Sequence, residues 1–145
     1  MEHFRLFRAA AGILLALPLL TACGDAPVLE VFEQAQADQD IVTIQRDLEG
    51  IDLSSTRFLA DRDGIEYFVA APTDSDGRTA CLLVEEGIGV ALECGPITSG
   101  EPGVIIRDSR ATVVLLPDEY NRDSLDAEGY RLLHPNLAIR ELPEV

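Results

Sequence analysis

The chain has 145 residues, about the length of one domain, and carries 26 acidic against 11 basic side chains for a net charge of -15. This length is too short for a TIM barrel or a two-domain enzyme. The acid excess and the absence of lysine argue against a nucleic-acid-binding protein, because clustered Lys and Arg supply phosphate affinity. Tryptophan is absent and aromatic residues make up 6%, which disfavours a sugar-stacking module.

Residues 1–22 have the pattern of a secretory signal. Arg5 and Arg8 precede an unbroken stretch of apolar and small residues, 9–20. At about 12 residues this stretch is shorter than the roughly 20 needed to cross a hydrocarbon core. A buried core helix is the alternative, but Pro18 would lie in its interior at a cost of roughly 3 kcal/mol. We therefore expect a signal peptide that is removed from the mature protein.

The end of this segment reads Leu20-Thr21-Ala22-Cys23 and resembles the lipobox of bacterial lipoproteins. In that family the cysteine is lipidated on sulfur before the signal is cut in front of it. The resemblance implies that Cys23 becomes the first mature residue and carries fatty acyl groups such as palmitate. Two or more acyl chains anchor a protein stably where one binds only marginally. We therefore expect anchoring to the extracytoplasmic face of the cell membrane.

The signal and the lipobox divide the chain into three predicted segments. They are a lipoprotein signal peptide at 1–22, a lipidated tether with a short helix at 23–40, and an extracytoplasmic domain at 41–145. Within the tether, Val28, Val31, Phe32 and Ala35 recur at helical spacing after Pro27 and predict a short helix.

The remainder of the chain has the pattern of a mainly β protein. Residues 38–53 are ambiguous, and from Thr56 onward short β-rich runs alternate with turn signals. The predicted strands are 56–60, 65–71, 79–84, 88–93, 103–107, 111–116, 130–133 and 137–140. Short strands without intervening helices predict an antiparallel meander or a small sandwich.

Cys81 and Cys94 remain as an even pair once Cys23 is lipidated, which suits an oxidising compartment. A two-residue turn at Gly87-Ile88 lies midway between them, and glycine at its first position suits a type II′ hairpin turn. Counting outward places Cys81 opposite Cys94 in a non-hydrogen-bonded pair, where the two Cα atoms are closest. This spacing predicts a structural disulfide worth roughly 3 kcal/mol. A redox pair or metal site is the alternative, although no CxxC spacing or neighbouring histidine supports it.

Two Asp-x-Asp-Gly quartets at 61–64 and 74–77 could hold Ca²⁺ through paired carboxylates. An EF-hand loop also needs an acid two residues earlier and a bidentate Glu at its twelfth position. Apolar residues stand at those places in both quartets: Leu59 and Ala70, then Pro72 and Leu83. The quartets therefore predict turns, and calcium binding stays open as an alternative.

Catalytic signals are weak. His134 is the one histidine after residue 22, and it lies in a turn-like Leu-His-Pro-Asn sequence. None of the serines lies in a Gly-x-Ser-x-Gly elbow, and the lack of lysine removes Schiff-base and Ser–Lys chemistry. The acids of the segment 118–128 are expected on a solvated loop that could meet a basic partner. We therefore predict no catalytic residues, metal ligands or cofactor.

A second, weaker resemblance concerns the domain itself. Residues 55–120 resemble small exported domains of high-GC Gram-positive bacteria. The motifs that carry the resemblance are Arg57-Phe58-Leu59, Tyr67-Phe68-Val69-Ala70, Cys81-Leu82-Leu83-Val84, Cys94-Gly95 and Leu116-Pro117-Asp118. The resemblance implies a β domain pinned by the disulfide and implies no particular activity.

The sequence thus predicts a lipid-anchored cell-envelope protein that acts as a non-enzymatic binding or accessory module. Without the signal the net charge is -16, which favours a basic envelope protein as partner and disfavours nucleic acid. Two alternatives remain: a divalent-cation-binding domain that uses the acidic loops, or a small hydrolase. A deep pocket that gathers His134, an acid and a serine would favour the hydrolase.

Overall fold

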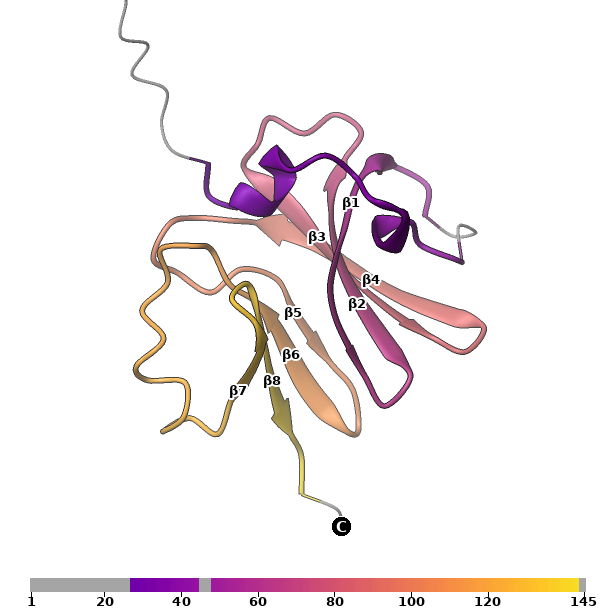
Figure 1. The fold of residues 1–145 in the computed structure, drawn as a ribbon. Coiled ribbons are helices and arrows are strands. Elements are labelled where there is room, and N and C mark those ends of the chain that lie inside the picture. The colour runs from indigo at the N-terminus through magenta and orange to yellow at the C-terminus, as the bar shows by residue number, and fades with distance from the viewer. Residues whose placement is uncertain (1–26, 45–47, 144–145) are drawn as a thin grey trace, which may run out of the picture.

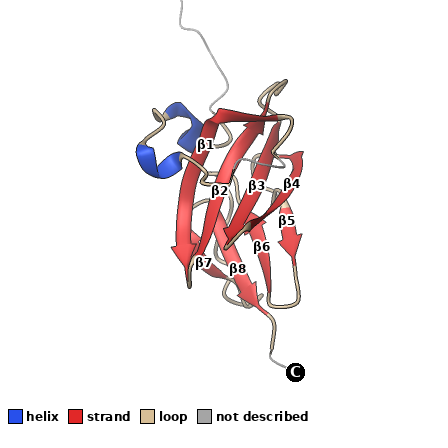
Figure 2. Ribbon diagram, turned by 90° about the vertical axis from the view of Figure 1, so that its right-hand side faces the viewer, coloured by secondary structure: helices blue, strands red, loops and turns tan. Residues whose placement is uncertain are grey.

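A computed structural model describes residues 27–44 and 48–143, so Cys23, the lipobox and the predicted signal peptide lie outside the described residues. The described chain forms two antiparallel sheets of four strands that pack face to face as a sandwich (Figures 1 and 2). The predicted mainly β class is confirmed. Within the described residues, no helix has the length and hydropathy needed to cross a bilayer.

The first sheet is a simple meander in the order β1-β2-β3-β4. Its strands are β1 (Ile51–Arg62), β2 (Ile65–Pro72), β3 (Thr79–Glu86) and β4 (Gly89–Pro96). The second sheet has the order β5-β6-β8-β7. Its strands are β5 (Ile105–Arg107), β6 (Ala111–Leu115), β7 (Arg131–His134) and β8 (Leu137–Glu141). All eight predicted strands are present, although β1 begins at Ile51 within the stretch that the sequence left ambiguous.

Local turn chemistry sets the register of the first sheet. Asp63 and Gly64 have φ values of 54° and 77° and form the two-residue turn between β1 and β2. Positive φ at both central residues is the requirement of a type I′ hairpin turn. The first acidic quartet therefore contains a hairpin turn, and Asp63 and Gly64 adopt the backbone conformation that this turn requires.

The disulfide hairpin of β3 and β4 has the predicted register. Gly87 has a φ of 59° in the turn, Glu86 pairs with Gly89, and Cys81 pairs with Cys94. The two cysteines form a disulfide, and their Cα atoms are 4.0 Å apart, as in the close kind of antiparallel pair. The bond joins two neighbouring strands of one sheet and does not link the two sheets.

The predicted N-terminal helix over 28–37 is wrong. The segment forms only two short 3-10 turns, η1 (Glu30–Glu33) and η2 (Asp38–Asp40). A helix of about ten residues is marginal by itself, and packing decides its conformation. Here Leu29 and Val31 are buried in the core between the sheets, and Asp118 accepts a hydrogen bond from the backbone N–H of Glu30.

The N-terminal segment also covers the edge of β1. The carboxylate of Asp40, which is only 6% exposed, accepts hydrogen bonds of 2.8 Å from the backbone N–H groups of Phe58 and Ala37. Gln36 donates to the hydroxyl of Thr56, and the guanidinium of Arg57 donates to the carbonyl of Gln34. The bond to Asp40 satisfies the backbone N–H of Phe58, and together these contacts cover an edge strand that would otherwise be open to pairing with another chain.

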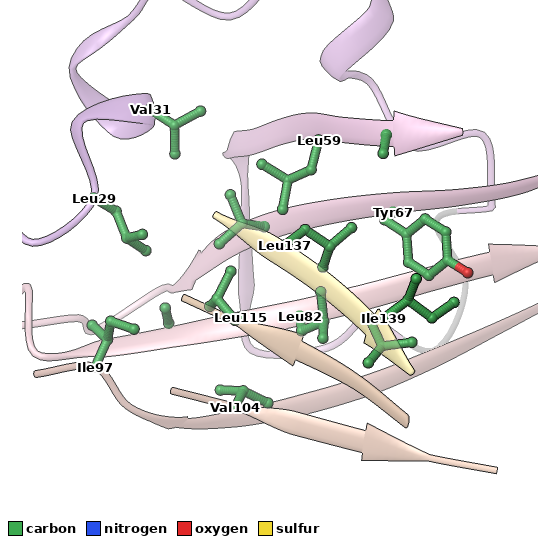
Figure 3. Close-up of a cluster of buried hydrophobic side chains, with 14 residues drawn as sticks. Leu29, Val31, Leu59, Tyr67, Leu82, Ile97, Val104, Leu115, Leu137 and Ile139 are labelled. Atoms are coloured by element: carbon green, nitrogen blue, oxygen red, sulfur yellow. The ribbon is translucent and has the colours of Figure 1, made fainter. Parts of the chain in front are cut away.

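The main core fills the space between the sheets (Figure 3). Leu82 of the first sheet and Leu115 and Leu137 of the second are fully buried at its centre. The outer faces are covered as well. Val42 and Leu48 pack on the first sheet, and Leu125 packs on the second. The sandwich therefore has one apolar layer between the sheets and a smaller apolar cluster on the outer face of each sheet.

Candidate functional site: a cleft between the sheets

A cleft of about 560 Å³ opens between the two sheets near the turns that join β1 to β2 and β5 to β6. This volume falls within the range of small-molecule sites. The uncharged side chains on its walls come from both sheets. They include Ile65, Tyr67, Val84, Ile106, Val113 and Ile139. We call this space the inter-sheet cleft.

Tyr67 brings a polar group into the apolar part of the inter-sheet cleft. The residue lies on β2 and is 2% exposed, and Figure 3 shows its ring beside Ile139 with the hydroxyl on the side away from Leu137. Among the described residues, the hydroxyl forms no hydrogen bond. Every fully buried side-chain oxygen or nitrogen in this part of the chain has a partner, so the hydroxyl oxygen of Tyr67 is not fully buried. The hydroxyl oxygen must therefore face the open space of the cleft.

Burial also determines the protonation state of Tyr67. Desolvation raises the pKa of the phenol above its usual value, and the charges of Arg62 and Arg110 oppose this shift. The phenol therefore stays protonated at neutral pH and can donate a hydrogen bond. The dependence on Arg62 and Arg110 agrees with a hydroxyl that points toward the charged opening.

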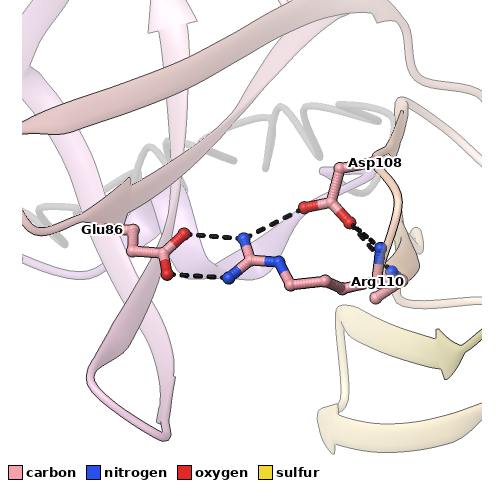
Figure 4. Close-up of polar contacts among 4 residues, drawn as sticks. Glu86, Asp108 and Arg110 are labelled. Atoms are coloured by element: carbon pink, nitrogen blue, oxygen red, sulfur yellow. Dashed lines mark hydrogen bonds and ion pairs between the residues drawn. The ribbon is translucent and has the colours of Figure 1, made fainter. Parts of the chain in front are cut away.

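An ion-pair group crosses one side of the opening (Figure 4). Both terminal nitrogens of Arg110 donate to the carboxylate of Glu86, at 2.7 and 2.6 Å, and one also donates to Asp108 at 3.2 Å. These bonds raise the pKa of Arg110 and lower the pKa of Glu86. Partial burial raises the pKa of Asp108, but hydrogen bonds from the backbone N–H groups of Arg110 and Ala111 outweigh it and the pKa is lowered.

A second ion pair crosses the other side. Arg62 at the end of β1 pairs with Glu141 at the end of β8, and it also lies 3.4 Å from the carboxylate of Asp63. Glu86 and Arg110 likewise come from opposite sheets. Each sheet thus contributes one arginine and one glutamate, and the two pairs bridge the sheets on either side of the inter-sheet cleft.

A second hollow of about 560 Å³ lies between the N-terminal segment and the turn from β7 to β8. It gathers His134 with the acids Glu30, Asp40 and Asp118, and no serine is among the described residues that line it. The combination of histidine, acid and serine expected of a small hydrolase is therefore not assembled by the described residues at this place.

His134 in this second hollow is part of a hydrogen-bonded turn. Its Nδ1 accepts a hydrogen bond of 3.0 Å from the backbone N–H of Asn136, so the neutral ring carries its proton on Nε2. The side chain of Asn136 donates to Asp118 at 2.7 Å. Partial burial lowers the pKa of His134, and the carboxylate of Asp118 opposes the shift.

This lowered pKa predicts a pH-dependent stability. Below the unfolded-state pKa of about 6.5, the unfolded chain binds a proton more readily than the folded one. The free energy of unfolding should therefore fall as the pH drops from 7.5 to 5.5. Urea titrations across this range should show a weaker decrease for His134→Gln, which cannot titrate there. Parallel curves for the two proteins would contradict the assignment.

The remaining predicted site residues are distributed as follows. Cys81 and Cys94 form the disulfide on the first sheet, away from the inter-sheet cleft. The quartet at 74–77 lies in the connection from β2 to β3, where Asp76 accepts a hydrogen bond from the backbone N–H of Arg78. Among residues 27–44 and 48–143, no group of three or more His, Cys, Asp or Glu side chains is placed to hold a metal ion.

Comparisons with family models, curated proteins and solved structures found no match to this chain.

Sequence reasoning did not identify Tyr67, Arg62, Glu86 or Arg110 as site residues. One signal was present: Ile65, Tyr67 and Val69 alternate with other residues along a strand, so they share one face. That pattern places Tyr67 in a core but does not show that the core opens beside it. Arg62 and Glu86 end strands and Arg110 lies in a turn, and acids and arginines at such places form no distinctive sequence pattern.

Proposed function

We propose that this chain is a lipid-anchored, non-enzymatic binding module at the extracytoplasmic face of the cell membrane, and that the inter-sheet cleft holds its ligand. The observation that carries the proposal is the form of the cleft. Apolar walls from both sheets surround a single hydroxyl, and bridging ion pairs flank the opening. Concave, mostly apolar spaces with a few polar groups are typical of small-molecule sites.

The protonation states at the cleft favour binding over catalysis. Glu86 and Asp108 have lowered pKa values and hydrogen-bond to Arg110, so both are ionised at neutral pH and unsuited to act as general acids. Tyr67 has a raised pKa, so it is unsuited to act as a base. These groups can fix and select a bound molecule without transferring protons.

The lipobox supports the membrane location, and the fold suits an anchor at that end. The five Cα–Cα steps from Cys23 to Val28 span at most about 17 Å, so a lipidated Cys23 would hold the domain close to the bilayer. Figure 1 shows the first described residues at one end of the molecule and the β1–β2 and β5–β6 turns at the other. An anchored domain would thus present the inter-sheet cleft away from the membrane surface.

The proposal predicts that protein released gently from its native membrane carries a small molecule in the cleft. Ala111 is half-buried on the cleft wall, so Ala111→Trp should fill the space and remove the bound molecule. Ala127→Trp is a matched control because Ala127 is exposed on the loop between β6 and β7. Native mass spectrometry should detect the additional mass in the wild type and the control. Equal occupancy in Ala111→Trp, or none in any form, would refute the cleft as the binding site.

A basic envelope protein is a second candidate partner. Asp123, Asp126 and Glu128 are exposed on the loop that follows β6, and they take part in none of the ion pairs among the described residues. The charge of -16 without the signal would speed the approach of a basic partner at low salt. Capture that weakens steeply with added salt would support this role.

A further inference from the structure

We propose that the ligand of the inter-sheet cleft is an uncharged, largely apolar small molecule with one carbonyl oxygen, which accepts a hydrogen bond from the hydroxyl of Tyr67. This inference rests on the proposed binding function and defines the chemistry of the same site. Three features of the cleft support it: the walls, the unpartnered hydroxyl and the charge balance of the opening.

The walls determine the apolar character of the ligand. Tyr67, Val113 and Ile139 are buried at the base, and Ile65, Val84 and Ile106 are half-buried above them. Water in contact with such surface is released when an apolar molecule binds, which gains roughly 25 cal/mol for each Å² buried. The apolar body of the ligand would take the place of that water.

The hydroxyl of Tyr67 determines which polar atom the ligand needs. This hydroxyl is the polar group that lies beside the apolar walls of the cleft, whereas the charged groups lie at the opening. Within the described chain it has no hydrogen-bond partner. A ligand without a matching acceptor would seal this hydroxyl away from water, at a cost of about 1–3 kcal/mol. A carbonyl oxygen at the same depth avoids this cost, and the protonated phenol is the donor that such an oxygen needs.

The charge balance of the opening argues against a charged ligand. Three arginines and four carboxylates line the cleft, so the opening has a net charge of only -1 on a chain of -15. They are Arg62, Arg107, Arg110, Asp63, Glu86, Asp108 and Glu141. Arg62 and Arg110 are already paired with Glu141 and Glu86, so a charged group that bound to any of these four side chains would have to displace an existing ion pair. An uncharged molecule passes between the pairs without breaking them.

Three probes of the same shape test the inference on the purified full-length mature protein. 2-Acetylnaphthalene has a carbonyl oxygen, 2-ethylnaphthalene lacks it, and 2-naphthoate carries a negative charge. Binding is measured by ¹H–¹⁵N chemical-shift titration, in which cleft residues such as Val84, Ile106 and Ile139 report the location. We expect the ketone to bind about 5- to 10-fold more tightly than the hydrocarbon, as one net hydrogen bond provides. The anion should bind most weakly.

The variant Tyr67→Phe keeps the ring and removes the hydroxyl. It should abolish the preference for the ketone by raising the affinity for 2-ethylnaphthalene, because no hydroxyl is then sealed away from water without a partner. If both probes bind in the cleft with the same affinity in the wild type, the assigned ligand chemistry is wrong while the binding function stands. Preferred binding of 2-naphthoate would also overturn the inference. If none of the probes perturbs the cleft residues, both the inference and the cleft as a binding site fail.

Discussion

Cys23→Ala is expected to move the protein from the membrane fraction to the soluble fraction. The lipobox resemblance makes the sulfur of Cys23 the attachment point of the lipid, and alanine offers no atom for that bond. The apolar stretch 9–20 of the signal is shorter than the roughly 20 residues needed to cross a hydrocarbon core, and the charge of -15 repels the chain from anionic headgroups, so neither should replace the lipid anchor. Membrane fractionation followed by immunoblotting measures the redistribution.

The double variant Cys81→Ala/Cys94→Ala is the matched control for this experiment. It removes the other two cysteines of the chain and leaves the lipobox intact. It should stay in the membrane fraction, with an acyl mass on its amino-terminal peptide. Retention of Cys23→Ala at the wild-type level would refute the anchor.

The same double variant is expected to lose about 3 kcal/mol of folding stability, because the disulfide closes a 13-residue separation between Cys81 and Cys94. For a domain of this size the loss corresponds to a fall of roughly 10 °C in Tm. Alanine is chosen because Cys81 is fully buried on its sheet, where the hydroxyl of serine would need a partner. Thermal unfolding followed by circular dichroism measures the change.

Reduced wild-type protein provides an independent comparison. It should unfold close to the temperature of the double variant, since both lack the constraint on the unfolded chain. Cys23→Ala keeps the disulfide and should unfold like the oxidised wild type. Two alkylatable thiols at Cys81 and Cys94 in the non-reduced protein would show that the bond does not form.

The first sheet was predictable because its hairpins are set by neighbouring residues. Gly87 in the turn and the alternation on either side place Cys81 opposite Cys94 with no information from the rest of the chain. The N-terminal helix was not predictable in the same way. The spacing of Val28, Val31 and Phe32 suits a helix, but hydrogen bonds between this segment and Asp118, in the loop after β6, replace the helical ones.

The sequence alone determined the β class, most of the strand positions and the disulfide, because each depends on residues close together in the chain, and the lipobox predicts a route to the membrane on the same local basis. Only the tertiary structure decided that the sheets form a sandwich and that a cleft opens between them. Tyr67, Ile106 and Ile139 meet there from three strands and both sheets. No sequence pattern predicts that these residues lie together, because their contact depends on how the two sheets pack against each other.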